Sequence, residues 1–168
     1  MPGYRFIASN TDRSRYYVGE LNGKSSKQAY MDALHISESN IINQTFHNPL
    51  GKMNGQDICI ISLKEVSGNG LCCYRQVNDS DVLVLLEEQD YNEILDETLQ
   101  RIRRDFNHIS GVFSINCVFR YLLFSQEHHM EDYLKTMSTL GEHAGLIGFG
   151  EHYNQQFVNQ TMTCVVFE

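Results

Sequence analysis

The sequence has no apolar run that approaches the roughly 20 residues that a membrane-spanning helix requires. The run Val-Leu-Val-Leu-Leu at 82–86 is far too short for that role. The N-terminus also lacks the basic and then apolar arrangement of a signal peptide. These absences predict a cytoplasmic protein with no membrane insertion.

Basic residues are also few. Lys and Arg number 13 against 21 Asp and Glu, which gives a formal net charge of −8. Because this surplus of acids repels phosphate groups, nucleic acid is not an expected partner. The densest basic stretch, Arg-Ile-Arg-Arg at 101–104, is interpreted as the solvated face of a helix.

No cysteine belongs to a Cys-x-x-Cys pair, although the chain has five cysteines. Cys72 and Cys73 are adjacent, and Cys59, Cys117 and Cys164 each have apolar neighbours. This pattern is typical of reduced, buried thiols in a cytosolic protein.

What the chain does contain is enough apolar character for a single domain spanning residues 1–168. The hydrophobic share is 42%, which is sufficient for a real core. In the N-terminal half, β-rich runs at 56–66 and 71–77 flank a Ser-Gly-Asn-Gly loop and predict a hairpin, with 80–89 as the next strand of an antiparallel meander. Further strands are expected at 4–9 and 15–26, and helices at 25–36 and 37–48.

The C-terminal half alternates helices and strands. The clearest helix is 90–109, where Ile94, Leu95, Leu99, Ile102 and Phe106 recur at helical spacing. The nearly continuous apolar run 111–124 is interpreted as a central strand buried on both faces. A helix at 125–141 and strands at 144–151 and 160–168 follow. The expected fold is α+β, with a mainly antiparallel mixed sheet and amphipathic helices packed on it.

A charged pair stands out in these apolar segments. Arg120 lies in the predicted central strand, and Glu151 ends another apolar strand. A buried guanidinium needs a partner, so one interpretation is a structural Arg120–Glu151 ion pair. The other is a pocket in which Arg120 holds a ligand carboxylate by two parallel hydrogen bonds.

Cys117 offers a second chemistry. A neighbouring cation lowers the pKa of a thiol, so Cys117 is a candidate nucleophile. However, the sequence shows no general base for it, and an ideal strand would place Cys117 and Arg120 on opposite faces. A packed thiol or a thiol that touches a ligand is the simpler interpretation.

Metal and cofactor signatures are weak. His128 and Asp132 have the spacing of two ligands on one helix face, but a solvated face explains them as well. The Gly-Phe-Gly-Glu segment at 148–151 lacks the third glycine and the following helix of a dinucleotide site. No metal and no cofactor is predicted.

Several segments, taken in order, resemble the C-terminal half of FIST sensory domains, named for F-box and intracellular signal transduction proteins. The resemblance lies in Leu-Asn-Gly-Lys-Ser-Ser-Lys-Gln-Ala-Tyr-Met-Asp-Ala-Leu at 21–34, Asn-Pro-Leu-Gly at 48–51, the strand–hairpin–strand block, Cys-Val-Phe-Arg at 117–120, Gly-Phe-Gly-Glu at 148–151 and Val-Asn-Gln-Thr at 158–161. It implies a sensory domain of the bacterial type that binds a small ligand such as an amino acid. It also implies two partners, an N-terminal FIST half and a signalling output module.

These observations predict a non-enzymatic, cytoplasmic sensor. Its ligand-binding residues are expected to be Cys117, Arg120, Glu151, Asn159 and Thr161. Asn159 and Thr161 are expected to tie the returning loop 152–158 to the end of the Cys117 strand. Two alternatives remain. In the first alternative, the chain is a protein-interaction module, as in an F-box adaptor, and this alternative predicts an exposed apolar patch. Alternatively, it is a thiol enzyme that uses Cys117.

Overall fold

The computed structural model describes residues 3–55, 57–153 and 156–168. The chain divides into two compact units, Met1–Glu88 and Gln89–Glu168. Both units combine helices with strands, and most strand pairs are antiparallel, so the predicted α+β class is confirmed. Among the described helices, none is both long and apolar enough to cross a membrane.

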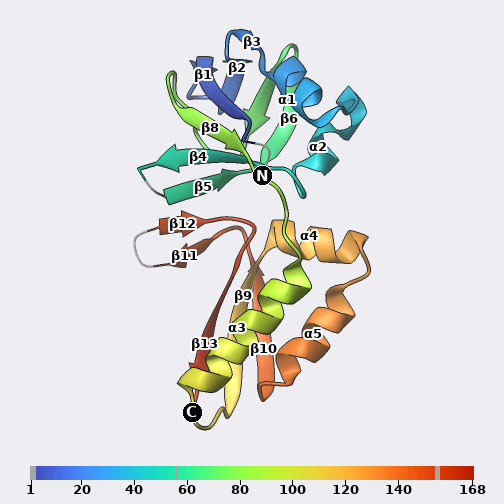
Figure 1. Ribbon diagram of the computed structural model, residues 1–168, viewed down its shortest axis with the longest axis vertical. Coiled ribbons are helices and arrows are strands. Elements are labelled where there is room, and N and C mark those ends of the chain that lie inside the picture. The colour runs from blue at the N-terminus through green and yellow to red at the C-terminus, as the bar shows by residue number, and fades with distance from the viewer. Residues whose placement is uncertain (1–2, 56, 154–155) are drawn as a thin grey trace. The chain divides into compact units, whose positions relative to one another are not determined.

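The first unit contains a sheet with the strand order β5-β4-β8-β1-β2-β7-β6, in which β3 also pairs with β2 (Figure 1). The strands are β1 (Arg5–Asp12), β2 (Tyr17–Leu21), β3 (Lys24–Ser25), β4 (Leu50–Asn54), β5 (Asp57–Ile61), β6 (Leu63–Ser67), β7 (Gly70–Cys73) and β8 (Val82–Leu85). Only Ser62 separates β5 from β6, although these strands lie at opposite ends of the order. The sheet therefore curls round, and a single bent segment supplies both of its ends.

Two predictions about this sheet need correction. The run 56–66 is two strands that bend at Ser62, and Gln56 lies outside the described residues. The predicted meander is wrong because β8 pairs with β1 and β4, whereas β7 pairs with β2 and β6. Long-range packing decides which strands pair, and the order of the strands along the chain does not determine the pairing. The hairpin of β6 and β7 is confirmed.

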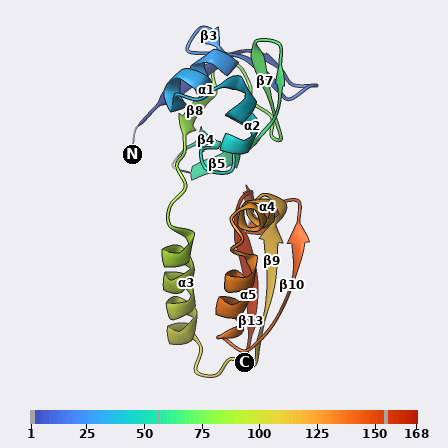
Figure 2. The same ribbon diagram turned by 90° about the vertical axis from the view of Figure 1, so that its right-hand side faces the viewer.

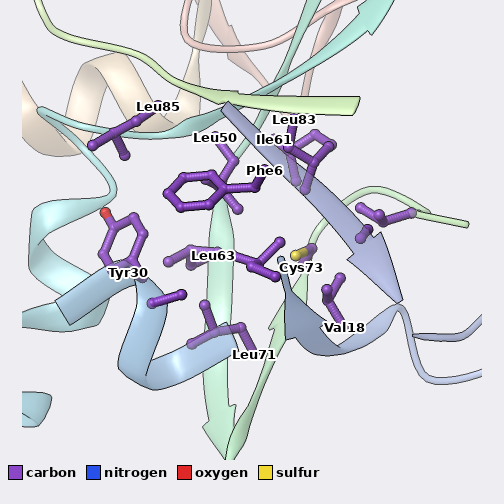
Figure 3. Packing of buried hydrophobic residues seen from close by; sticks show 14 of the residues in the cluster. Phe6, Val18, Tyr30, Leu50, Ile61, Leu63, Leu71, Cys73, Leu83 and Leu85 are labelled. Atoms are coloured by element: carbon purple, nitrogen blue, oxygen red, sulfur yellow. The ribbon is translucent and has the colours of Figure 1, made fainter. Parts of the chain in front are cut away.

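Helices cover one part of this sheet. They are α1 (Ser26–Leu34), the 3-10 helix η1 (Glu38–Asn40) and α2 (Ile41–Gln44). Ser25 caps α1, because its side chain accepts a hydrogen bond from the Gln28 N–H. Figure 3 shows Tyr30 of α1 facing Phe6 and Leu63 inside the core, where all three are buried.

The second unit has a three-stranded sheet, β10-β9-β13, and a separate hairpin, β11-β12. Its elements are α3 (Tyr91–Asp105), β9 (Gly111–Cys117), α4 (Val118–Gln126), α5 (Met130–Ser138), β10 (Glu142–Gly148), β11 (Glu151–Tyr153), β12 (Gln156–Val158) and β13 (Met162–Phe167). The central strand β9 is parallel to β10 and antiparallel to β13. Helices α3 and α5 lie on the same side of this sheet (Figure 2).

The helix α3 agrees with the sequence prediction. The Asp90 carboxylate caps it by accepting hydrogen bonds from two backbone N–H groups. Leu95, Leu99 and Ile102 are buried as expected, but Ile94 is 46% exposed and does not face inward. The three arginines at 101–104 are exposed, which confirms a solvated face.

The prediction of one strand over 111–124 is wrong after Cys117. The chain leaves β9 at Cys117 and enters the helix α4 at the next residue. A continuous apolar run suits a buried strand and a buried helix equally, so its pattern could not reveal the change. Arg120 therefore lies in the first turn of a helix, and the argument about opposite strand faces does not apply to it.

Candidate functional site

Arg120 is held at the junction of β9 and α4. Its Nη1 donates a hydrogen bond to Asn116 Oδ1 over 3.1 Å. The guanidinium carbon lies 4.6 Å from the centroid of the Phe124 ring and 5.3 Å from that of Tyr133. These contacts hold the guanidinium against two neighbouring aromatic rings, an arrangement that favours its charged form.

Burial lowers the pKa of Arg120, while the nearby Tyr133, Glu151 and Cys117 act in the opposite direction. Since the pKa of an arginine normally exceeds about 12, the side chain remains a cation near neutral pH. One guanidinium nitrogen is used by Asn116. The planar group has five N–H donors, so it has capacity for a further acceptor.

Glu151 is the carboxyl partner that the sequence suggested for Arg120. It begins β11 and is only 3% exposed. Its Oε2 accepts a hydrogen bond from Thr161 Oγ1 over 2.7 Å. Burial raises the pKa of Glu151, and the Thr161 hydrogen bond and the Arg120 charge lower it by lesser amounts.

Arg120 and Glu151 influence each other electrostatically, but they do not form the direct ion pair that one interpretation expected. Among the residues that the structure describes, the ion pairs involve other side chains. Each of the two charged groups therefore keeps bonding capacity that the other does not use.

The other predicted residues lie at the same end of the sheet. Cys117 is 1% exposed, and its N–H donates to the carbonyl oxygen of Thr161 over 3.0 Å. This bond confirms that Thr161 ties the returning chain to the end of β9, although residues 154–155 of the loop lie outside the described residues. Asn159 is buried beside Gly150. Its role as a ligand-binding residue stays a prediction, as do those of the other four.

Unpartnered polar atoms mark this region. In the described part of the chain, four buried side-chain atoms lack a hydrogen-bond partner: Asn116 Nδ2, His129 Nε2, Tyr133 Oη and Glu151 Oε1. All four lie in the second unit. Buried polar atoms without partners are rare because each costs about 1–3 kcal/mol. Three of them belong to residues that contact Arg120 or act on its charge, and we call Asn116, Arg120, Tyr133 and Glu151 the Arg120 centre.

Two members of this centre, Asn116 and Tyr133, are not evident from the sequence. Asn116 was visible as a polar residue four positions before Arg120 in an apolar run. That spacing points to contact only if the chain turns helical after Cys117, which the pattern did not show. Tyr133 is a buried residue of α5. Nothing in its sequence context reveals that its ring meets Arg120.

The basis of the metal alternative does not hold. The helix α5 begins at Met130, and His128 precedes it with a positive φ of 56°. His128 and Asp132 therefore do not share one helix face. The Asp132 carboxylate lies 3.8 Å from Lys135 Nζ.

The model of the FIST C domain matches residues 27–154. The chain belongs to the FIST C domain family. Membership of this family links the chain to signal transduction, and the matched range includes Asn116, Arg120, Tyr133 and Glu151. No curated protein and no solved structure gives a match.

The glycines of the Gly-Phe-Gly-Glu segment shape this part of the FIST C domain. Gly150 has a φ of +134°, and a Cβ there would collide with the Phe157 ring and lie 3.1 Å from Asn159 Oδ1. A Cβ on Gly148 would have one tight contact, with Ile115 Cγ2 at 3.2 Å, and ordinary contacts with the Gly150 carbonyl oxygen at 3.5 Å and Glu151 Oε1 at 3.7 Å. Glycine is therefore required at 150 and is far less constrained at 148.

We expect Gly150→Ala to destabilise the second unit by about 1–3 kcal/mol, because it combines a clash with an unfavourable φ. Gly148→Ala is the matched control and should cost clearly less. Urea denaturation of both variants measures the difference. Equal losses would mean that the backbone at 150 does not need glycine.

Proposed function

We propose that this FIST C domain is a non-enzymatic sensor that binds a small ligand, such as an amino acid, at the Arg120 centre. The observation that carries the proposal is the set of unpartnered buried atoms around a cation. Glu151 Oε1 accepts hydrogen bonds, Asn116 Nδ2 donates them, and neither has a partner. Membership of a signalling family supports the same role.

The chemistry of the centre suits a zwitterion. Arg120 would hold a carboxylate, since a guanidinium forms strong paired hydrogen bonds with carboxylates. Asn116 Nδ2 would donate to the same carboxylate, and Glu151 Oε1 would accept from an ammonium group. Cys117, Asn159 and Thr161 would line the wall. The contacts of Asn116 Nδ2 and Glu151 Oε1 would satisfy two atoms that otherwise remain unpaired at a cost.

A thermal-shift screen against amino acids and small carboxylates tests the proposal. We expect at least one compound to raise the melting temperature of the wild-type chain, and Arg120→Met to abolish that rise. Met keeps apolar contact with the Phe124 and Tyr133 rings while removing the charge. Arg101→Met, on the exposed face of α3, is the matched control and should retain the full response.

Two results would count against the sensor. One is a ligand response that survives Arg120→Met. The other is an Arg120→Met chain that is unfolded by circular dichroism, which would make the guanidinium a structural element. The proposal also includes a cytoplasmic location, an N-terminal FIST half and a signalling output module as partners, all of which rest on family membership.

A second candidate function is a protein-interaction module. One face of the β10-β9-β13 sheet carries exposed apolar side chains, which strand pairing brings together: Phe113, Leu146, Val165 and Phe167. Exposed apolar faces of this kind mark interaction surfaces. This candidate predicts that no compound in the screen stabilises the chain. A ligand response that is lost in Arg120→Met but kept in Val165→Lys would favour the sensor instead.

A further inference from the structure

Glu151 is a buried carboxyl with one satisfied and one unsatisfied oxygen. The residue is 3% exposed, and Thr161 donates to its Oε2. Its Oε1 is buried without a hydrogen-bond partner. The position where a Cβ of Gly148 would stand is 3.7 Å from this Oε1, so the oxygen lies over a bare stretch of backbone.

An ionised carboxylate is poorly supported in this setting. A buried charge is costly unless an opposite charge and several hydrogen bonds compensate it. Glu151 receives one side-chain hydrogen bond, from Thr161, and weaker support from its own backbone N–H. Arg120 makes its own contacts with Asn116 and two aromatic rings. The neutral acid avoids most of that cost, and the Thr161 bond to Oε2 leaves Oε1 as the oxygen to carry a proton.

We propose that Glu151 carries a proton on Oε1 in the ligand-free domain and releases it when an ammonium-bearing ligand binds at the Arg120 centre. The inference rests on the proposed function and adds a proton to its binding equilibrium. The O–H bond of the acid breaks, the proton passes to the buffer, and the carboxylate accepts a hydrogen bond from the ligand ammonium. The Glu151 carboxylate then pairs with the ligand ammonium, and Arg120 pairs with the ligand carboxylate, so each charge at the centre has an opposite partner.

The groups around Glu151 agree with this linkage. Among the described residues, the charged side chain that acts on the Glu151 carboxyl is Arg120 of α4. The neighbours that carry no charge are Gly148 at the end of β10, Thr161 before β13 and Val158 of β12, which pairs with Glu151. Burial outweighs the charge of Arg120, and the net result is a raised pKa for Glu151.

The sign of the pH dependence follows from this raised pKa. In the folded chain, the contribution of Glu151 to the free energy of unfolding is complete at low pH and is lost as pH rises through its folded pKa. Glu151→Gln should therefore stabilise the ligand-free domain at neutral pH and matter less in acid. As pH increases toward that pKa, the affinity for an ammonium-bearing ligand should increase by up to about tenfold per pH unit. Above that pKa, the affinity should level off.

Carbon-13 NMR of glutamate-labelled full chain tests the ligand-free half of the inference. The spectrum of Glu151→Gln identifies the Glu151 carboxyl signal by its absence, and an amide spectrum of that variant checks its fold. We expect the Glu151 signal to titrate at a higher pH than the exposed glutamates, such as Glu93. Titration together with the exposed glutamates would overturn the inference.

Glycine, acetate and methylammonium test the ligand half. Calorimetry in two buffers of different ionisation enthalpy should show close to one proton released per glycine bound at acidic pH, and none released on binding to Glu151→Gln. Acetate, which has no ammonium group, should bind without releasing a proton. Glycine binding without proton release would overturn this inference and leave the sensor intact. Failure of all three probes to bind would count against the sensor and this inference together.

Discussion

Phe124→Ala is expected to lower the free energy of unfolding of the second unit by about 3–5 kcal/mol, as is typical for loss of a buried phenyl ring. Phe124 is 1% exposed. Its ring lies 4.9 Å from the rings of Tyr91 and His129 and 5.5 Å from that of Tyr133. Three helices meet at this ring, so the neighbouring side chains cannot easily close the cavity that alanine would leave.

The same substitution removes part of the support of Arg120, whose guanidinium lies over the Phe124 ring. We therefore expect the ligand-induced rise in melting temperature to disappear in Phe124→Ala even at temperatures where the chain remains folded. Thermal shift measures this loss separately from stability. Restoration of the response by Phe124→Tyr, which keeps an aromatic ring beneath the cation, would identify the ring as the support.

Leu122→Ala provides the control for the stability measurement. Leu122 lies on the same helix and is 40% exposed, so its truncation should change the free energy of unfolding by no more than about 0.5 kcal/mol. Urea denaturation followed by circular dichroism gives the overall loss, and hydrogen exchange of peptides from residues 89–168 locates it. Similar losses in the two variants would show that Phe124 does not anchor this unit.

Tyr30→Ala is expected to have an effect of similar size in the first unit, about 3–5 kcal/mol by analogy with other large aromatic truncations. Tyr30 is fully buried in the core (Figure 3). Its hydroxyl donates a hydrogen bond to the carbonyl oxygen of Asn48 over 2.7 Å. The ring thus joins α1 to the segment that leads into β4, and its removal affects both.

Tyr30→Phe separates the hydrogen bond from the packing. It keeps the ring but leaves the Asn48 carbonyl without this donor, for an expected loss of about 1 kcal/mol. Urea denaturation of the two variants measures the ratio of the losses. If Tyr30→Phe proved as damaging as Tyr30→Ala, the hydroxyl rather than the ring would be the main contribution.

Local signals in the sequence explain which elements could be predicted. The helix α3 was predictable because Asp90 supplies a cap and apolar residues recur at helical spacing behind it. The hairpin of β6 and β7 was predictable from its glycine-containing loop, where Gly68 has a φ of +60°. The strand order of the first unit was not predictable, because pairing between distant strands leaves no mark on either strand alone.

The candidate site also has some features that the sequence predicted and others that it could not predict. Arg120 and Glu151 were selected because charged side chains in apolar segments must find partners somewhere. The structure places them near each other without a direct ion pair. That relationship depends on the turn from β9 into α4, which directs Arg120 toward Asn116 and the two aromatic rings.

By itself, the sequence determined the α+β class, the acidic charge, the free cysteines and the family. These properties come from composition, local spacing and the order of motifs. Only the tertiary structure decided that Asn116 and Tyr133 join Arg120 and that Glu151 retains an unpartnered oxygen. Contacts between residues far apart in the chain depend on where each element ends and on the direction in which the chain continues. A continuous apolar run such as 111–124 does not show the residue at which a strand ends and a helix begins.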